Sequence, residues 1–447
     1  MAKHVYTAAV CILASSLALA APPVADLKGL DALYPALDVL YRDLHQNPEL
    51  SFQEVKTAAK MAAQLRAAGF EVTEKVGGHG VVGVLRNGAG PTIMVRTDID
   101  ALPILEKTGL PYASTVMAKD AAGNAVPVFH GCGHDIHMTG WVGAATLLAR
   151  SKDRWHGTLV FVAQPAEEVL QGANAMVNDG LLTRFPKPDM VLGLHDTNLI
   201  PSGQVGIVSG PASAASNAVD ITIYGKGGHG AAPHTTIDPI VIAARTVTTL
   251  QSVVAREVNP FDPAIITVGT FHSGSKRNII SDEARLELTV RSYKPAVQAQ
   301  LLKAIERIAK AEALAAGAPR APTILLVPNE ASEVVVNTPA MAAQLLTALR
   351  KSMGEANVAT IGPTSASEDF GVYGRIAGVP SLQLRIGAIE PKLYAASKAG
   401  GAALPSTHSP FWAPDRESTI RTSVAALTYS VLELMARPVK PSAVLAP

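Results

Sequence analysis

The hydrophobic positions downstream of residue 26 follow helical and strand spacing in turn. Residues 31–44 and 51–68 have apolar side chains at helical spacing, and Ser51 with Glu54 three positions later predicts a capping box at the start of the second helix. Short runs rich in Val and Ile then alternate with helix-like stretches, which predicts crossover connections and a mainly parallel sheet. The runs are residues 82–85, 92–95, 159–162 and 190–194, and the helix-like stretches are residues 136–149 and 173–181.

The pattern changes over residues 214–328. Two long helices and several strands of alternating polarity make up this segment, which is typical of a compact α+β unit with a half-exposed antiparallel sheet. The earlier alternation resumes after Asn337. We therefore predict a discontinuous α/β domain over residues 27–213 and 329–437, with residues 214–328 inserted as a satellite domain. The satellite strands are predicted at residues 218–224, 265–271, 284–291 and 323–327, and its helices at residues 239–256 and 296–315.

The first twenty residues have the pattern of a cleaved export signal. Lys3 and His4 precede an apolar run that ends in Ala18-Leu19-Ala20, a small-residue exit of the kind that signal peptidase requires. The alternative is an N-terminal membrane anchor, but the apolar run has about 15 residues where a span needs about 20. We therefore expect a periplasmic or secreted protein without a stable membrane anchor. Cleavage would leave Cys132 as the single cysteine, so that this thiol is inert, reactive or metal-bound.

Composition and charge narrow the function. The chain has 447 residues, of which 48% are hydrophobic and 17% are charged, and its formal net charge is +1. This composition supports a substantial folded core and excludes a disordered chain. A near-neutral charge, without a basic run that carries interleaved aromatic residues, gives no reason to expect a nucleic acid partner.

The strongest local motif is the hexapeptide His130–Asp135, a glycine-rich turn that leads into a helix. Gly131 and Gly133 allow the backbone to fold tightly, so that the Cys132 thiolate and the His134 imidazole can converge on one cation. The alternative for this motif alone is a buried structural cysteine beside a hydrogen-bonded histidine.

Further candidate ligands follow the predicted strands. Glu167 and Glu168 come after the strand at residues 159–162, and His195 closes the strand at residues 190–194. His408 lies in a loop between two prolines. Taken singly, the two acids could be solvated and each histidine structural. Residues at the carboxyl ends of parallel strands, however, face the crevice in which such sheets bind ligands.

Together these residues form a metal-ligand set. Thiolate, imidazole and carboxylate donors at several strand ends suit two divalent ions better than one. Zinc is favoured by cysteine and histidine, with manganese and cobalt as further candidates. Glu167 is left over as a general base for a metal-activated water. The five predicted ligands are Cys132, His134, Glu168, His195 and His408.

An ordered series of motifs extends this interpretation over roughly residues 35–437. The motifs are Asp43–Leu50, Arg96–Pro103, Gly131–Asp135, Pro165–Glu168, Gly193–His195, Gly225–Gly230, Asn278–Ile280 and Ser367–Phe370. With them the chain resembles the amidohydrolase branch of the M20 metallopeptidase family, which includes hippurate hydrolases, N-acyl-amino-acid amidohydrolases and auxin-conjugate hydrolases. The resemblance implies the same five metal ligands and the same role for Glu167. The chain departs from the family pattern at Ser281 and at Asp196.

The resemblance also implies roles for the satellite domain. In the family this domain is lid-like and commonly mediates dimerisation, which implies a homodimer or higher homo-oligomer for this chain. The histidine that matches His229 reaches the partner's site to stabilise the oxyanion. Asn278 and Arg291 match positions expected to hold a substrate carboxylate, and a surface ion pair is the alternative for Arg291. Asp98 and Asp100 are expected to orient ligands rather than to bind metal.

The predicted function is hydrolysis of the amide bond of an N-acyl or N-aroyl amino acid, or of a short dipeptide, by an exported two-metal enzyme. Two alternatives remain open at this point. One is a metallo-carboxypeptidase or dipeptidase of similar architecture that acts on free peptides. The other is a non-catalytic binding protein built on the same scaffold.

Overall fold

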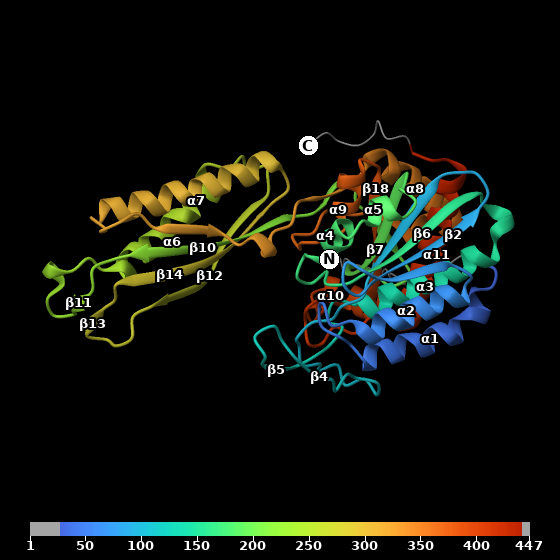
Figure 1. The fold of residues 1–447 in the computed structure, drawn as a ribbon, viewed down its shortest axis with the longest axis horizontal. Helices are drawn as coiled ribbons and strands as arrows, with labels where there is room; N and C mark the ends of the chain where they lie inside the picture. Colours follow the sequence, from blue (N-terminus) through green and yellow to red (C-terminus); the bar gives the residue numbers. More distant parts are fainter. Residues whose placement is uncertain (1–26, 440–447) are drawn as a thin grey trace, which may run out of the picture.

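A computed structural model describes residues 27–439, so the predicted export signal lies outside the described residues. The chain forms two units joined side by side (Figure 1). The larger unit is built on an eight-stranded sheet, and the smaller one on a four-stranded sheet formed by strands between Ala215 and Leu326. The large sheet is mainly parallel, as we predicted.

The central strands of the large sheet carry the site. Strands β6, β3, β7 and β18 lie next to one another in parallel, so their carboxyl ends meet at one edge of the sheet. Antiparallel pairing adds β2 and β1 on one side and β8 on the other, and β17 pairs with β8 in parallel. The bounds are β1 (Glu71–Val76), β2 (Gly80–Asn87), β3 (Thr92–Asp98), β6 (Gly157–Gln164), β7 (Met190–Pro201), β8 (Val205–Ile207), β17 (Val358–Thr360) and β18 (Ser381–Ile389).

Helices cover both faces of this sheet, which is why its strands are apolar on both sides. Ile93 and Val95 of β3 belong to the large cluster formed with one set of helices, whereas Met94 belongs to the cluster on the other face. The first set is α1 (Leu30–Gln46), α2 (Val55–Ala67), α3 (His134–Arg150), α8 (Pro339–Met353) and α11 (Arg416–Ala436), and the second is α4 (Gly172–Asn178), α5 (Leu181–Arg184) and α9 (Gly371–Ala377).

The smaller unit has its own core. Its two helices pack on one face of the sheet, whose order is β12-β14-β10-β15, and their buried side chains form a separate cluster. A short β11–β13 ribbon lies at the end farthest from the large unit (Figure 1). The bounds are β10 (Ala215–Tyr224), β11 (Gly228–His229), α6 (Pro239–Arg256), β12 (Ala264–Ser273), β13 (Ile279–Ile280), β14 (Glu283–Ser292), α7 (Pro295–Ala315) and β15 (Thr323–Leu326).

A two-stranded ribbon connects the units. Strand β9, Gly210–Ser213, precedes the satellite, and β16, Val335–Asn337, follows it; the two pair antiparallel, with Val335 opposite Ser213. The remaining elements are β4 (Met117–Lys119), β5 (Ala125–Pro127) and α10 (Pro391–Lys398).

The predicted capping box at Ser51 is wrong. Helix α2 begins at Val55, so that Glu54 and not Ser51 takes the N-cap position, and the Glu54 side chain makes no capping hydrogen bond. The Ser51 hydroxyl instead donates to Asp100 at 2.6 Å, and the Glu54 carboxylate accepts from the backbone of Phe52 and of Ala166, each at 2.8 Å. Both polar groups are thus used to fix loops near the site, since a buried loop must find partners for its polar atoms.

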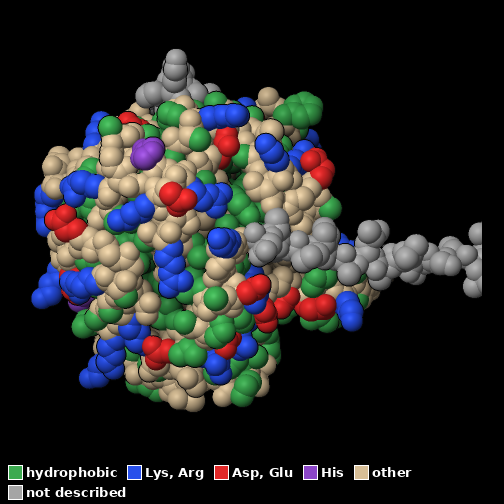
Figure 2. Space-filling model, turned by 90° about the vertical axis from the view of Figure 1, so that its right-hand side faces the viewer, with side chains coloured by type: hydrophobic (Ala, Val, Ile, Leu, Met, Phe, Trp, Pro, Cys, Tyr) green, Lys and Arg blue, Asp and Glu red, His purple; other side chains and the backbone are tan. Residues whose placement is uncertain are grey.

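Two surface features complete the description. Within residues 27–439, no helix combines the length and the apolar character that a bilayer crossing demands. On the face drawn in Figure 2, basic and acidic side chains are interspersed among hydrophobic ones.

Candidate metal centre

The predicted ligands come from four places around the carboxyl edge of the large sheet. Cys132 and His134 lie at the start of α3, Glu168 follows β6, and His195 lies in β7. His408 reaches the same place from the loop before α11, where its backbone N–H donates to the Gly131 carbonyl at 2.7 Å. The structure therefore brings together residues up to 276 positions apart, from 132 to 408.

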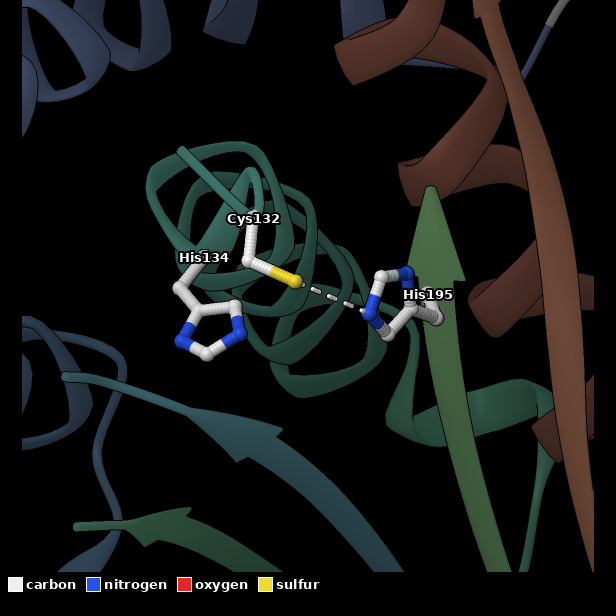
Figure 3. A group of neighbouring side chains, drawn as sticks. All are labelled: Cys132, His134 and His195. Atoms are coloured by element: carbon white, nitrogen blue, oxygen red, sulfur yellow. Dashed lines mark hydrogen bonds between the residues drawn. The ribbon is translucent and has the colours of Figure 1, made fainter. Parts of the chain in front are cut away.

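The turn before α3 depends on Gly133. Its φ is +77°, a left-handed conformation that glycine adopts freely, and it directs both neighbouring side chains to one side. A Cβ at this position would lie 2.0 Å from the Asp196 Oδ2 atom. Figure 3 shows the result: the Cys132 sulfur points toward the His195 ring, at 3.5 Å from Nε2, with the His134 ring beside it.

The ligand atoms form overlapping groups. Cys132, His134 and His195 make one group, and Cys132, Glu168 and His408 make another, each with its ligand atoms within 4.8 Å of one another. The Cys132 sulfur belongs to both groups and so lies between them. The Glu168 carboxylate is 3.3 Å from His408 Nε2 and 3.7 Å from His134 Nε2.

Within residues 27–439, two buried ligand atoms in the cluster have no hydrogen-bond partner, and a bound cation would provide one for each. Among the described residues, His134 Nε2 and Glu168 Oε1 are buried without a hydrogen bond. Burial raises the pKa of the Cys132 thiol, and the charges of Glu168 and Glu167 raise it further, so a thiolate here needs a neighbouring cation. Mixed sulfur, nitrogen and oxygen donors in this arrangement fit two divalent metal ions.

The other ring nitrogens are held by neighbouring groups. The His134 Nδ1 atom is 2.8 Å from the Asp100 carbonyl, and the His195 Nδ1 atom is 2.7 Å from the Asp196 carbonyl. A carbonyl accepts a hydrogen bond, so in each ring Nδ1 carries the proton and Nε2 is free to bind metal.

Glu167 lies beside the predicted ligands but belongs to neither of the two groups that share Cys132. It is 4% exposed, and its carboxylate is 3.7 Å from His134 Nε2. Burial raises the pKa of Glu167 well above the usual range, and the charges of Glu368 and Glu168 raise it further. A carboxylate whose pKa is raised by its surroundings is a better proton acceptor, which suits a general base.

A buried ionic network lies behind the cluster, and of its members only Asp98 was assigned a role from the sequence. Arg96 contacts three carboxylates, Asp98 at 2.6 Å, Glu368 at 3.1 Å and Asp369 at 3.2 Å. Asp98 in turn contacts His137 Nδ1 at 2.7 Å, and His137 Nε2 accepts from the Asp196 backbone at 2.9 Å. His137 was missed, although its position one helical turn after His134 was a usable signal.

The three residues predicted in the satellite lie in two separate places. His229 and Asn278 lie together on the β11–β13 ribbon, where the Gly230 N–H donates to the Asn278 carbonyl, and His229 is exposed. This ribbon is the end of the satellite farthest from the metal-ligand cluster (Figure 1). Arg291 instead lines a cavity of about 660 Å³ that also contains Cys132, Glu167 and Glu168. The structure thus places one of the three satellite residues at this chain's own site.

Comparison with known proteins identifies the family of the chain. Residues 94–398 match the family described as Peptidase family M20/M25/M40, which is more than half of the chain. The chain belongs to this family. It is therefore a metal-dependent enzyme that hydrolyses amide bonds, and the resemblance inferred from the motifs is confirmed.

Relatives within the M20 family cover most of the chain. The hippurate hydrolase of Campylobacter jejuni is 35% identical over 354 residues, which is 79% of this chain and 87% of that protein. The thermostable carboxypeptidase 2 of Saccharolobus solfataricus is 39% identical over 271 residues, 60% of this chain and 66% of that protein. The crystal structure of the Bacillus subtilis YXEP protein, a dinuclear metal-binding peptidase, is 28% identical with a TM-score of 0.72, covering 90% of this chain and 99% of that one.

Proposed function

We propose that this M20 enzyme hydrolyses the amide bond of N-acyl or N-aroyl amino acids to a carboxylic acid and an amino acid, with two divalent metal ions per subunit. One observation carries the proposal: four of the five predicted metal ligands line a cavity that also contains the buried acid Glu167 and the satellite arginine Arg291, and the fifth, His134, is grouped with Cys132 and His195. The likeness to a hippurate hydrolase supports the same substrate class.

The residues divide the chemistry among them. Cys132, His134, Glu168, His195 and His408 would hold the ions, which when bound polarise the scissile carbonyl and acidify water. Glu167 takes the proton from the attacking water and later delivers it to the leaving nitrogen, so that its carboxyl ends the cycle as it began. Arg291, on the satellite strand β14, holds a substrate carboxylate in the same cavity.

The test is Glu167→Gln, with the half-buried satellite residue Glu283→Gln as a control that removes the same charge. We expect Glu167→Gln to keep its metal content and to lose turnover of hippurate about 100- to 10,000-fold. Glu283→Gln should match the wild type. Turnover that survives in Glu167→Gln would remove Glu167 from the reaction.

His229 is proposed to act in a second copy of the chain. It is exposed on the far ribbon, so a homodimer through the satellite would be needed to bring it to a metal centre, where its N–H would stabilise the oxyanion. Mixing inactive His229→Ala and Glu167→Gln subunits should restore activity, because each mixed dimer contains one site with both residues intact. Analytical sedimentation measures the oligomeric state of the protein in solution. An active monomer, or a mixture as inactive as its components, would overturn this role.

A carboxypeptidase or dipeptidase activity is the second candidate, and the likeness to the S. solfataricus carboxypeptidase favours it. Hydrolysis rates of blocked acyl amino acids and of unblocked dipeptides, measured on one preparation, separate the two. Reconstituting metal-free protein with zinc, manganese or cobalt over the same panel identifies the metal that supports turnover.

Export is proposed from residues 1–20 alone. The mature protein should begin at Ala21, as read by mass spectrometry of the protein recovered from the periplasm or the medium. A cell-retained chain that still carries Met1–Ala20 would contradict the proposal.

A further inference from the structure

A second arginine faces the metal-centre cavity from the large sheet. Arg385 lies on β18 and is paired in register with His195 on the parallel strand β7. Registered residues of neighbouring parallel strands point to the same face of the sheet, so the Arg385 side chain stands beside a metal ligand. Both residues line the 660 Å³ cavity.

Arg385 is buried without a carboxylate of its own. It is 6% exposed. Among residues 27–439, no carboxylate lies close enough to its guanidinium, within 4 Å, to form an ion pair. Its Nη2 atom donates to the neutral Ser213 hydroxyl at 2.7 Å. Burial lowers the pKa of Arg385, yet guanidinium stays charged in proteins. A buried charge of this kind is costly unless an anion accompanies it.

The nearby acids are occupied elsewhere. Glu368 is paired with Arg96 at 3.1 Å, and Asp196 accepts from the Trp412 indole at 3.2 Å. Glu167 and Cys132 belong to the proposed catalytic cluster, where bound metal ions would neutralise their charge. The cavity therefore has a cation on its floor whose counter-ion the chain itself does not provide.

Arg291 is anchored to the same short segment as Arg385. Ser213 accepts from Arg385, and Ser216, three residues later, pairs with Arg291 across the satellite sheet. Arg291 Nη1 is buried without a hydrogen-bond partner, and so is the Ser367 hydroxyl oxygen on the wall of the same cavity. The two guanidinium groups thus face one cavity from two domains, with unused donors at both.

We propose that Arg385 binds a second carboxylate of the substrate, so that the preferred substrates carry two carboxylates, one held by Arg291 and the other by Arg385. This inference rests on the proposed amidohydrolase function. The second carboxylate can come from an acidic amino acid, as in N-acetylglutamate, or from a dicarboxylic acyl group, as in N-succinylalanine. Guanidinium binds carboxylate through two parallel hydrogen bonds, which suits either source.

The experiment compares each dianionic substrate with its amide isostere on the metal-loaded enzyme. N-acetylglutamate is paired with N-acetylglutamine, and N-succinylalanine with N-succinamoylalanine. We expect a wild-type preference in kcat/KM of about 10- to 100-fold for the dianion in one pair, and the pair that shows it identifies the source of the carboxylate. Arg385→Met should reduce that ratio to about 1, whereas Arg285→Met, which removes an exposed arginine of the satellite sheet, should keep it.

A more conservative variant and a binding measurement guard against loss of folding or of turnover. Arg385→Lys keeps the charge but not the forked geometry and should give an intermediate ratio. Calorimetry on metal-loaded Glu167→Gln protein should show the same preference without turnover.

The outcomes separate this inference from the proposed function. Amide hydrolysis without a preference for either dianion would leave the proposed function standing and overturn the second carboxylate site. A preference that survives Arg385→Met would overturn it too, as would an Arg385→Met variant that loses activity equally on all four substrates. A calorimetric preference in a protein that hydrolyses neither these substrates nor hippurate would support the site and refute the function.

Discussion

Replacing Arg96 with Met should destabilise the large unit by about 3–5 kcal/mol, because it leaves buried carboxylates without their cation. Arg96 is fully buried and contacts Asp98, Glu368 and Asp369 within 3.2 Å, and its Nε atom donates to Gln164 at 2.8 Å. Methionine fills much of the space but supplies no donor. A loss of this size is a large fraction of the free energy of unfolding of a typical domain, which is roughly 5–15 kcal/mol.

Tryptophan fluorescence in urea is the appropriate assay. The three tryptophans of the chain, Trp141, Trp155 and Trp412, are all buried in the large unit, so their emission follows that unit and not the satellite. The control is Arg66→Met, which removes an arginine that is 53% exposed and paired with Glu74 at 2.6 Å. An exposed pair of this kind contributes about 0–1 kcal/mol.

The pH dependence adds an independent check. Burial raises the pKa of Asp369 to about 7 even with Arg96 in place, although the Arg96 charge lowers this pKa; the Glu368 charge raises it further. Without Arg96 the buried carboxylates should take up protons more readily when folded than when unfolded, so the variant should lose stability as pH rises from 5.5 to 8. A loss below about 1 kcal/mol, or one equal to that of Arg66→Met, would refute the view that Arg96 neutralises this cluster.

Two further predictions concern positions around the site. Gly133→Ala should lose metal and stability, because the new Cβ would lie 2.0 Å from Asp196 Oδ2. The control is Gly69→Ala, where φ is +88° and no atom lies within 4 Å of the new Cβ, so that only backbone strain is added. This control should keep its metal, as measured by atomic absorption. Burial alone would lower the pKa of His45, but its hydrogen bonds to Asp135 and Glu106 raise it to about 9. The pKa of His45 is higher in the folded than in the unfolded protein. The wild type should therefore have a higher free energy of urea unfolding than His45→Gln, with the full difference present below pH 6.5 and about 3 kcal/mol of it lost as pH rises through 9. A pH-independent difference would show that His45 stays neutral.

The sequence was sufficient where periodicity or a local turn determines structure. The spacing of Pro239–Arg256 predicted α6 with its observed bounds, since the apolar stripe is long and a proline begins it. The Ser51 capping box failed because the motif is also satisfied by tertiary contacts, here to Asp100 and to the Ala166 backbone. Local patterns cannot weigh such distant partners.

The site shows the same division. Strand-end ligands could be predicted because each follows an apolar run, whereas His137 and Arg385 lie inside a helix and a strand that look like ordinary core. Arg385 is followed by Ile386 and preceded by Leu384, so nothing in its neighbourhood distinguishes a cavity wall from a buried strand. Its position beside His195 exists only through the pairing of β18 with β7.

The connection between the units joins the cavity to the satellite. Ser213, the acceptor for Arg385, ends strand β9 of the connecting ribbon and is paired with Val335 on the returning strand. Three residues further, Ser216 enters the satellite sheet opposite Arg291. A rotation of the satellite about this ribbon therefore changes the separation of the two guanidinium groups, because one is fixed to the large sheet and the other moves with β14. It follows that the length of a two-carboxylate substrate and the angle between the units must be matched to one another.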